Sequence, residues 1–327
     1  ERVSRTVCRK IGIPADRVLL GQDIDDMDDT ALQQAMEEVS VCAKLSPQQK
    51  ARIVRCMHDA GHTVGYMGDG INDASAMHQA DVAVSVESAV DIARETADII
   101  LLEKSLMVLE EGVLEGRRTF GNIIKYIKMA ASGNFGNMLS VLFASIFLPF
   151  LPILPVQLLA QNLLYDISQL AIPFDYVDDE YLTRPRTWKA KSIGSFMFIL
   201  GPLSSFFDIC AFLVLYYVMG FRTVEQAVFF QSSWFVFGLV SQTVVVHLIR
   251  TPQVPFFKAR SSIVLVASTV VVALVGIISP FTPLGIALDM VRIPWKVYGY
   301  FALILAGYVC CIEAVKLWYR RTGRAWL

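Results

Sequence analysis

The segment Gly68-Asp69-Gly70-Ile71-Asn72-Asp73 places two acids four residues apart in a glycine-rich stretch. It follows the apolar run 63–67, which predicts a short strand, and precedes residues 74–79, which predict a helix. Ligands of open α/β sheets gather at the carboxyl ends of strands, and Mg²⁺ prefers carboxylate oxygens. The segment therefore predicts a Mg²⁺ site held by Asp69 and Asp73, with the two glycines lining it. Gly-Asp-Gly alone also suits a simple turn, but the strand–loop–helix setting favours the metal site.

Lys50 is a second candidate at the same end of the expected sheet. The preceding Ser46-Pro47-Gln48-Gln49 is a capping box with proline at the first helical position, so Lys50 falls on the first turn of a helix. This helix follows a strand at 41–45 and extends to Gly61. A cation here could balance a phosphoryl oxygen, although a lysine at a helix start is also often a plain surface charge. Spacing alone leaves both interpretations open.

Composition divides the chain near residue 125. Of the 327 residues 54% are hydrophobic, above the roughly 45–50% of a soluble domain, and the excess lies in 126–327. In the first part, predicted strands alternate with predicted helices, which is typical of a parallel sheet with helices on both faces. The strands are 17–20, 41–45, 63–67, 81–86 and 98–102, and the helices are 3–11, 29–39, 47–61, 74–79 and 89–97. The formal net charge of −1 gives no indication of a nucleic-acid partner.

The second part predicts a membrane domain. Six spans of about 20 residues have the length that a bilayer core requires. They are 127–148, 154–173, 194–218, 228–249, 261–280 and 297–317. The loops on one side carry ten Lys and Arg residues and those on the other carry three. By the positive-inside rule, residues 1–125 and the carboxyl terminus are cytoplasmic. An amphipathic stretch at 106–126 predicts a stalk helix continuous with the first span.

Polar side chains within the first two spans predict a cation site. Asn134 and Asn137 are three residues apart and Asn162 and Asp166 are four apart, so each pair shares one helix face. Ionisable groups in a bilayer are costly and by default mark functional sites. The alternative is that the asparagines only bond helix to helix. Asp208, in the third span, is interpreted as a helix–helix contact in preference to a second functional acid.

Three motifs resemble the phosphorylation domain of P-type ATPases, which has the haloacid-dehalogenase-like, Rossmannoid fold; they are 43–50, 68–73 and 80–84. The resemblance implies that Lys50 contacts the phosphoryl group and that Asp69 helps to hold the catalytic Mg²⁺. Asn72 and Asp73 match the positions that complete the site. Residues 74–77 depart from the family's usual Ala-Pro-Ala-Leu, and serine for proline is a mild change at a helix start.

The family's Asp-Lys-Thr-Gly-Thr motif, whose aspartate becomes phosphorylated, does not occur in this sequence. The resemblance therefore implies a carboxyl-terminal fragment that should not hydrolyse ATP by itself, with ATP bound mainly by a missing upstream domain. The expected partners are Mg²⁺, membrane lipids and the amino-terminal half of the pump. The expected division is a partial phosphorylation domain at 1–105, a stalk at 106–126, a membrane domain of the family's fifth to tenth helices at 127–320, and a cytoplasmic tail at 321–327.

In ion-pumping members of the family, the fifth and sixth membrane helices carry Asn-x-x-Glu and Asn-x-x-Thr-Asp ligands. Asn134, Asn162 and Asp166 match this pattern, whereas Asn137 replaces an acid and Tyr165 replaces a hydroxyl residue. One carboxylate fewer suits a single, partly hydrated divalent cation, and Mg²⁺ dehydrates reluctantly. The wider pattern resembles bacterial magnesium-importing members, which lie in the inner membrane, at 101–106, 115–120, 161–175 and 246–251. The alternatives are a pump for Ca²⁺ or H⁺ and a non-catalytic membrane module.

Overall fold

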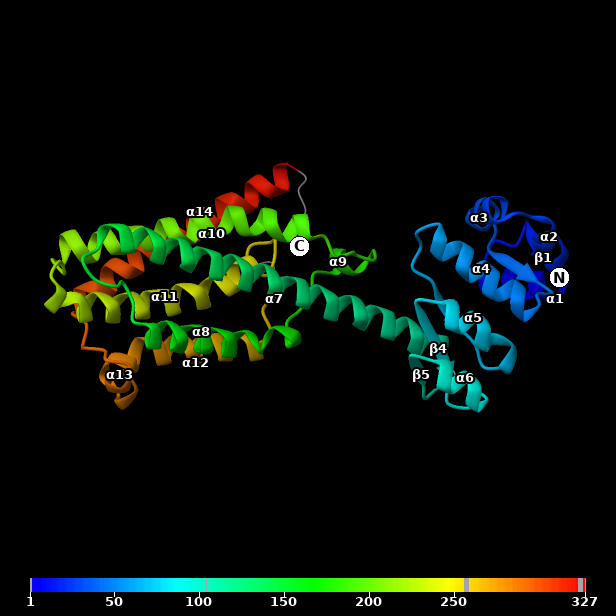
Figure 1. Ribbon diagram of the computed structural model, residues 1–327, viewed down its shortest axis with the longest axis horizontal. Helices are drawn as coiled ribbons and strands as arrows, with labels where there is room; N and C mark the ends of the chain where they lie inside the picture. The colour runs from blue at the N-terminus through cyan, green and yellow to red at the C-terminus, as the bar shows by residue number, and fades with distance from the viewer. Residues whose placement is uncertain (1, 104, 256–258, 323–325, 327) are drawn as a thin grey trace. The chain divides into compact units, whose positions relative to one another are not determined.

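The computed structural model describes residues 2–103, 105–255, 259–322 and 326. Its contacts divide the chain into two compact units, Glu1–Val113 and Leu114–Leu327, each described by itself below. The first unit combines short strands with helices, and the second unit is helical (Figure 1). Lys258 and Arg324, two of the cations counted for membrane orientation, lie outside the described residues.

The strands of the first unit form two parallel sheets. In one, β1 (Val18–Leu20) pairs with β2 (Val41–Ala43). In the other, β4 (Val82–Val86) lies between β3 (Gly65–Met67) and β5 (Ile99–Leu101). The parallel pairing agrees with the predicted alternation of strands and helices. The sequence predicts a single sheet. Within the described residues, however, no strand of the first sheet pairs with a strand of the second.

The helices of the first unit are α1 (Arg2–Ile11), α2 (Gly21–Asp26), α3 (Asp29–Glu38), α4 (Pro47–Asp59), α5 (Ala74–Gln79) and α6 (Asp91–Thr96). The sequence predicts five of them and misses α2. That helix is a six-residue, acid-rich segment in which Ile24 is the one large apolar residue, so it has no apolar periodicity to detect. A 3₁₀ turn at Ile71–Asp73 precedes α5.

The capping box predicted for α4 is confirmed. The Ser46 hydroxyl accepts a hydrogen bond from the Gln49 amide at 3.2 Å, and the Gln49 side chain accepts one from the Ser46 amide at 2.8 Å. Two backbone donors that the first helical turn leaves free are thereby satisfied. Pro47 occupies the first helical position, and Gly61 follows the helix with a φ of +92°. This fixes where α4 begins and therefore where Lys50 is placed.

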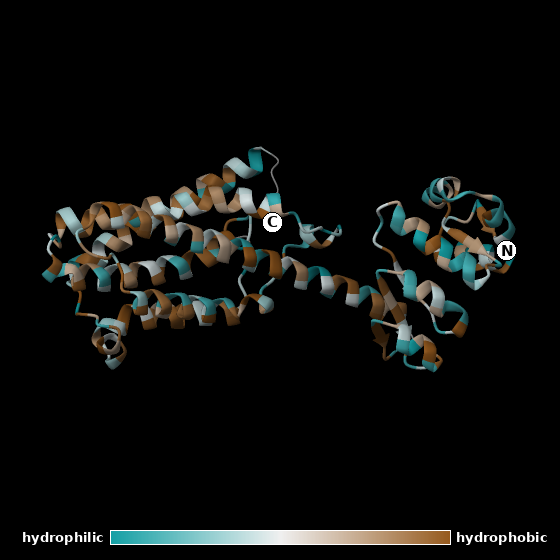
Figure 2. Ribbon diagram, viewed as in Figure 1, coloured by the Kyte–Doolittle hydropathy of each residue, from teal (hydrophilic) through white to brown (hydrophobic). Residues whose placement is uncertain are grey.

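The long helices of the second unit are α7 (Leu106–Phe147), α8 (Pro155–Gln169), α10 (Ala190–Leu213), α11 (Ala227–Ile249), α12 (Ile263–Ile278) and α14 (Trp295–Arg321). Short helices α9 (Asp179–Leu182) and α13 (Pro283–Ala287) lie in connections, and a π-helical turn at Val214–Val218 ends α10. Most of the long helices run side by side and are rich in hydrophobic residues (Figures 1 and 2). The most buried is α11, which packs against α8, α10, α12 and α14.

Five helices among the described residues are long and apolar enough to cross a membrane. They begin or end close to five of the six predicted spans. The second predicted span, 154–173, corresponds to α8, which has 15 residues and a length of about 22 Å, short of the roughly 30 Å hydrocarbon core. A 3₁₀ turn at Ile172–Phe174 follows it, with Pro173 at its centre. The count of six spans stays a prediction.

Trp326 is buried in the second unit. Its indole Nε1 donates to the Ile249 carbonyl at 2.7 Å, and its own carbonyl accepts from Lys128 Nζ at 2.8 Å. The indole packs edge-on against Phe196 and Tyr319, with ring centroids 5.1 Å apart in each case. Within the predicted tail of 321–327, this described residue therefore contacts the helices α7, α10, α11 and α14.

Candidate functional site

The loop that follows β3 is held by hydrogen bonds to neighbouring elements. The Gly68 amide donates to the Val84 carbonyl at 3.0 Å, and the Gly68 carbonyl accepts from the hydroxyl of Ser85 at 2.8 Å. The Asp69 carbonyl accepts from the Val90 amide at 3.2 Å. Ser85 lies on the central strand β4 and is fully buried. The backbone of the two residues after β3 is thus fixed to β4 and to the start of α6.

The two glycines of this loop differ in their surroundings. A Cβ on Gly68 would lie 2.5 Å from the Cβ of Asp73 and 3.1 Å from the sulfur of Met77. Gly70 has an extended backbone with φ of −121°, and its nearest neighbour would be 3.7 Å away. Only Gly68 is therefore required sterically, because it lets Asp73 approach the end of the strand.

Asp73 accepts two hydrogen bonds on one oxygen. Lys50 Nζ, from α4, lies 2.8 Å from Oδ1, and the Tyr66 hydroxyl, from β3, lies 2.9 Å from the same atom. Burial acts to raise the pKa of the Asp73 carboxyl, but the bonds from Lys50 and Tyr66 outweigh it and hold that pKa below 3.8. Burial and the same carboxylate raise the pKa of Tyr66. At neutral pH the arrangement is thus a carboxylate between an ammonium and a neutral phenol.

Asp69 and Asp73 line one cavity of about 330 Å³, whose other lining residues are Met67, Gly68, Val86, Ser105 and Leu106. The Asp69 side chain is exposed, and Asn72 is exposed on the 3₁₀ turn without lining the cavity. The structure therefore brings Lys50 to Asp73 and places Asp69 at the same opening. It leaves Asn72 apart from them.

The chemistry of this cavity fits a hard divalent cation. Two carboxylates line it, and both hydrogen bonds to Asp73 end on Oδ1, so among the described residues Oδ2 accepts no side-chain bond. No group of three or more His, Cys, Asp and Glu side chains converges in the part of the chain described. Asp69 and Asp73 are thus the carboxylates that could hold Mg²⁺ there. When bound, Mg²⁺ would neutralise charge on a phosphoryl oxygen.

The sequence did not identify two residues that shape this site. Tyr66 and Ser85 both lie in strands that the sequence predicts from apolar runs. The available signal was one polar group within each strand, the phenol in Gly65–Met67 and the hydroxyl in Val82–Val86. A buried polar group needs a hydrogen-bond partner, and here the partners are the carboxylate of Asp73 and the backbone of Gly68.

The four membrane candidates lie on α7 and α8. Asn134 is exposed, and Asn137 is half-buried with its Nδ2 lacking a partner. Asn162 is half-buried, and Asp166 is exposed and lines a cavity of about 350 Å³ between these two helices. No described hydrogen bond joins the α7 pair to the α8 pair. Tyr165 lies beside Gly133, where a Cβ would be 3.6 Å from the phenol oxygen.

The interior of the second unit contains further polar groups that the sequence did not single out. Among the described residues, the amide oxygens of Gln161 and Gln242 are buried without a protein partner. A small cavity of about 20 Å³ lies nearby, lined by Tyr165, Gln242 and several serines, and it has room for about one water molecule. This cavity lies between α7, α8, α10, α11 and α14, and its hydroxyl and amide groups could bind a water molecule.

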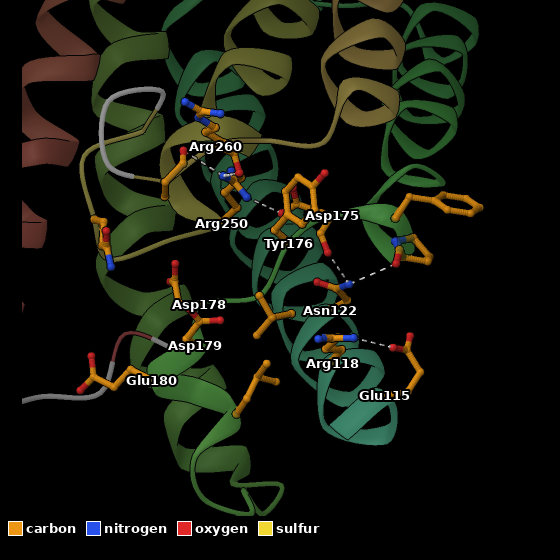
Figure 3. A pocket seen from close by; sticks show the side chains of 16 residues that line it. Glu115, Arg118, Asn122, Asp175, Tyr176, Asp178, Asp179, Glu180, Arg250 and Arg260 are labelled. Carbon is orange, nitrogen blue, oxygen red and sulfur yellow. Dashed lines mark hydrogen bonds and ion pairs between the residues drawn. The ribbon is translucent and has the colours of Figure 1, made fainter. Parts of the chain in front are cut away.

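A larger cavity of about 670 Å³ opens in the second unit (Figure 3). Asp175 lines this cavity, and its side chain is 1% exposed. One oxygen of its carboxylate accepts hydrogen bonds from Lys125 Nζ at 3.2 Å and from Arg250 Nη1 at 2.6 Å. The Ser262 amide donates to its second oxygen at 3.2 Å, and Asn122 Nδ2 donates to its carbonyl at 3.0 Å. Asp175 therefore ties α7, the segment after α8 and the connection from α11 to α12 together.

The comparisons with known proteins all find cation-transporting ATPases. A family model described as "Cation transporting ATPase, C-terminus" matches residues 150–318. The magnesium-transporting ATPase, P-type 1 of Escherichia coli K12 is 52% identical over 321 residues, which is 98% of this chain and 36% of that protein. A protein of the same name from Salmonella typhimurium LT2 is 48% identical over 324 residues, 99% of this chain and 36% of that protein.

A calcium-transporting ATPase of Bacillus subtilis is more distant. It is 30% identical over 249 residues, covering 74% of this chain and 28% of that protein. The chain spans about 36% of the length of the magnesium-transporting relatives that it matches. The family model, the high identity along nearly the whole chain and the apolar helices agree with one another. The chain therefore belongs to the cation-transporting P-type ATPases.

Proposed function

We propose that this chain is the carboxyl-terminal part of an ATP-driven pump that transports Mg²⁺ across the bacterial inner membrane through an aspartyl-phosphate cycle. The phosphorylated aspartate belongs to the upstream part of the protein. The observation that carries the proposal is the 52% identity over 98% of the chain to a magnesium-transporting ATPase. The calcium-transporting relative of Bacillus subtilis, at 30%, supports Ca²⁺ less well.

The phosphoryl chemistry is assigned to the cavity after β3. Lys50, positioned by Asp73, provides a positive charge for the phosphoryl oxygens, which develop negative charge during transfer. Asp69 and Asp73 are the Mg²⁺ ligands that this chain supplies. Tyr66 orients the Asp73 carboxylate through its hydrogen bond, and Gly68 leaves room for that carboxylate. Asn72 is assigned to the same site from the family motif.

The first unit is assigned to a partial phosphorylation domain with the haloacid-dehalogenase-like fold, over residues 1–105. Two parallel sheets with intervening helices support this assignment. Within the described residues β1 pairs only with β2 and β3 only with β4. Each of these strands therefore has an open edge that could pair with a strand from the upstream part of the pump.

The transported cation is assigned to the polar faces of α7 and α8. Asn134, Asn137, Asn162 and Asp166 offer amide and carboxylate oxygens, which suit a hard cation. The unpartnered amide nitrogen of Asn137 and the exposed carboxylate of Asp166 are consistent with groups that a ligand completes. With one carboxylate in the set, a cation that keeps part of its hydration shell fits better than a fully dehydrated one.

Transport by the complete pump in sealed vesicles tests the choice of cation. ATP should drive Mg²⁺ movement, and Asp166→Asn should reduce it at least tenfold, because that change removes the one carboxylate of the set. Asp179→Asn, at an exposed acid on α9, is the matched control and should transport normally. ATP-driven Ca²⁺ or H⁺ transport without Mg²⁺ transport would contradict the assignment.

Acid-stable phosphorylation by ATP tests the enzymatic part. The complete protein should form a phosphoenzyme, and Asp69→Asn should strongly slow its formation or breakdown, whereas Asp26→Asn, at an exposed acid on α2, should not. A complete protein that forms no phosphoenzyme, and whose upstream sequence lacks Asp-Lys-Thr-Gly-Thr, would instead favour the non-catalytic membrane module.

A further inference from the structure

Asp208, on α10, is an acid enclosed by three other helices. It is 4% exposed. Its Oδ2 lies 2.6 Å from the hydroxyl oxygen of Ser140 on α7, and its Oδ1 accepts from Trp234 Nε1 on α11 at 3.3 Å. The third of these helices, α14, contributes Tyr308, which stacks on Phe207, the residue before Asp208. The carboxyl group therefore faces neutral side chains on every helix packed against it.

Within the part of the chain that the structure describes, no cation contacts the Asp208 carboxyl. Among the described residues, the buried ion pairs of the second unit use Lys125 and Arg250 with Asp175, and Lys316 with Glu313. None of these cations contacts Asp208, and its carboxyl is hydrogen-bonded to Ser140 and Trp234. A carboxylate without a counter-charge is costly inside a protein and more so within a bilayer. The surroundings thus favour the neutral form.

The Ser140 hydroxyl lies within hydrogen-bond distance of two acceptors, and this arrangement leaves room for a proton on Asp208. Its Oγ is also 2.9 Å from the carbonyl of Gly136, four residues earlier on α7. Two other serines of α7 make the same kind of bond, Ser132 to Lys128 at 2.7 Å and Ser145 to Val141 at 2.8 Å. A serine hydroxyl has one hydrogen. When Ser140 donates it to Gly136, the 2.6 Å contact needs a hydrogen from Asp208.

We infer that Asp208 is a proton-binding site of the membrane unit. Its carboxylate takes up one H⁺ to form a neutral acid, whose hydroxyl donates to Ser140 and whose carbonyl oxygen accepts from Trp234. None of its described contacts involves Asn134, Asn137, Asn162 or Asp166, so this site is separate from the one assigned to the transported cation. The inference does not depend on which cation the pump transports.

Infrared difference spectroscopy of the complete pump in lipid membranes at neutral pH tests this site. The spectrum of Asp208→Asn should lack one C=O stretching band of a protonated carboxylic acid, and in the wild type that band should shift in D₂O. The exposed Asp179 supplies the matched control, since Asp179→Asn should instead lose a carboxylate band. If Asp208→Asn, like Asp179→Asn, loses a carboxylate band and keeps every C=O stretching band of protonated carboxylic acids, the inference is wrong.

A second variant keeps the acid and changes only its acceptor bond. In Trp234→Phe the aromatic ring that packs on Phe212 is retained, while the indole N–H that bonds to Oδ1 is removed. The acid band assigned to Asp208 should remain and move to higher wavenumber, because its carbonyl loses a hydrogen bond. This measurement also applies if Asp208→Asn fails to fold. An acid band that is absent from Trp234→Phe, or that does not move, would overturn the assignment to Asp208.

Discussion

Asp73 is the residue on which the candidate phosphoryl site depends. Its Oδ1 accepts from Lys50 on α4 and Tyr66 on β3, so one carboxylate connects a helix, a strand and the turn that precedes α5. Hydrogen bonds to charged groups are stronger than those between neutral groups. The position of the Lys50 ammonium therefore follows from Asp73, even though nothing in the spacing of the two residues reveals their contact.

Replacing Lys50 by methionine should slow phosphoenzyme formation by the complete pump by about 100-fold or more, since it removes one preorganised positive charge from a developing anion. Lys50→Arg should retain more activity than Lys50→Met, because arginine keeps the positive charge. It should remain below wild type, because a planar guanidinium replaces the compact ammonium. The measurement is the rate of acid-stable incorporation of labelled phosphate. Equal rates in Lys50→Met and wild type would mean that Lys50 is a plain surface charge.

The ion pair also predicts a pH dependence of local stability. The folded pKa of Asp73 is lowered from 3.8, so its stabilising effect is complete above 3.8 and is lost as the pH falls through the lower folded value. Hydrogen exchange in α4 and α5 should be faster in Asp73→Asn than in wild type at neutral pH. The two proteins should converge in acid. A difference that persists in strong acid would contradict the ionic origin.

Sequence reasoning at the residue scale identified charges but not their neutral partners. The position of Asp69 and Asp73 after a strand predicts a metal site, whereas the spacing of Lys50 leaves a surface charge equally open and only the family resemblance implies its role. Tyr66 and Ser85 were missed because a phenol or hydroxyl inside an apolar strand has many possible partners. Their partners depend on which strand lies alongside, and pairing is a tertiary property that no local pattern contains.

At the scale of elements, the turn after β3 depends on one of its two glycines. Gly68→Ala should lower the unfolding temperature of the first unit, at a cost of about 1–3 kcal/mol, because its Cβ would meet the Cβ of Asp73 at 2.5 Å. Gly70→Ala is the matched control. Its extended backbone accepts alanine and its surroundings have space, so it should be neutral or stabilising by about 0.4–1 kcal/mol.

The unfolding temperatures of the two variants, together with their hydrogen-exchange rates in α5, measure this contrast. Equal destabilisation by the two changes would mean that backbone freedom, and not the approach of Asp73, explains why the loop contains glycine.

The elements that local chemistry specifies could be predicted from sequence. The capping box fixed the start of α4, and long apolar runs located α10, α11, α12 and α14. Sequence reasoning is less accurate where the end of a helix or the pairing of strands depends on tertiary contacts. The span 154–173 contains α8, a 15-residue helix, and then a 3₁₀ turn, since Pro173 cannot continue the hydrogen-bond ladder. The division into two sheets was also invisible, because strand pairing is non-local.

At the scale of the whole molecule, the second unit is held by a few buried charges as well as by apolar packing. Asp175 lies between Lys125 and Arg250, all three of them nearly inaccessible to solvent. Sequence reasoning uses Arg250 as a marker of membrane orientation and as part of the segment 246–251 that resembles the family, and assigns it no contact. Its contact with Asp175, 75 residues earlier, could not be foreseen, because it requires the connections after α8 and α11 to meet.

Asp175→Asn should destabilise the second unit by about 3–5 kcal/mol, since it leaves two buried cations without their shared counter-charge. The unfolding temperature of the complete pump in detergent is the measurement. Asp179→Asn, at an exposed acid four residues later, should change it little. Asp175→Glu should recover part of the loss. If Asp175→Asn melts like wild type, the three charges do not hold these connections together.

The bond between Lys128 and Trp326 has a consequence for biosynthesis. Lys128 is 2% exposed, and its Nζ is bonded to a carbonyl that lies 198 residues later in the chain. A ribosome releases the helix that carries Lys128 long before it makes Trp326. During that interval the Lys128 ammonium lacks this carbonyl partner, and water or a lipid headgroup can take its place. The bond that covers the Lys128 ammonium can therefore form only after α14 has been synthesised.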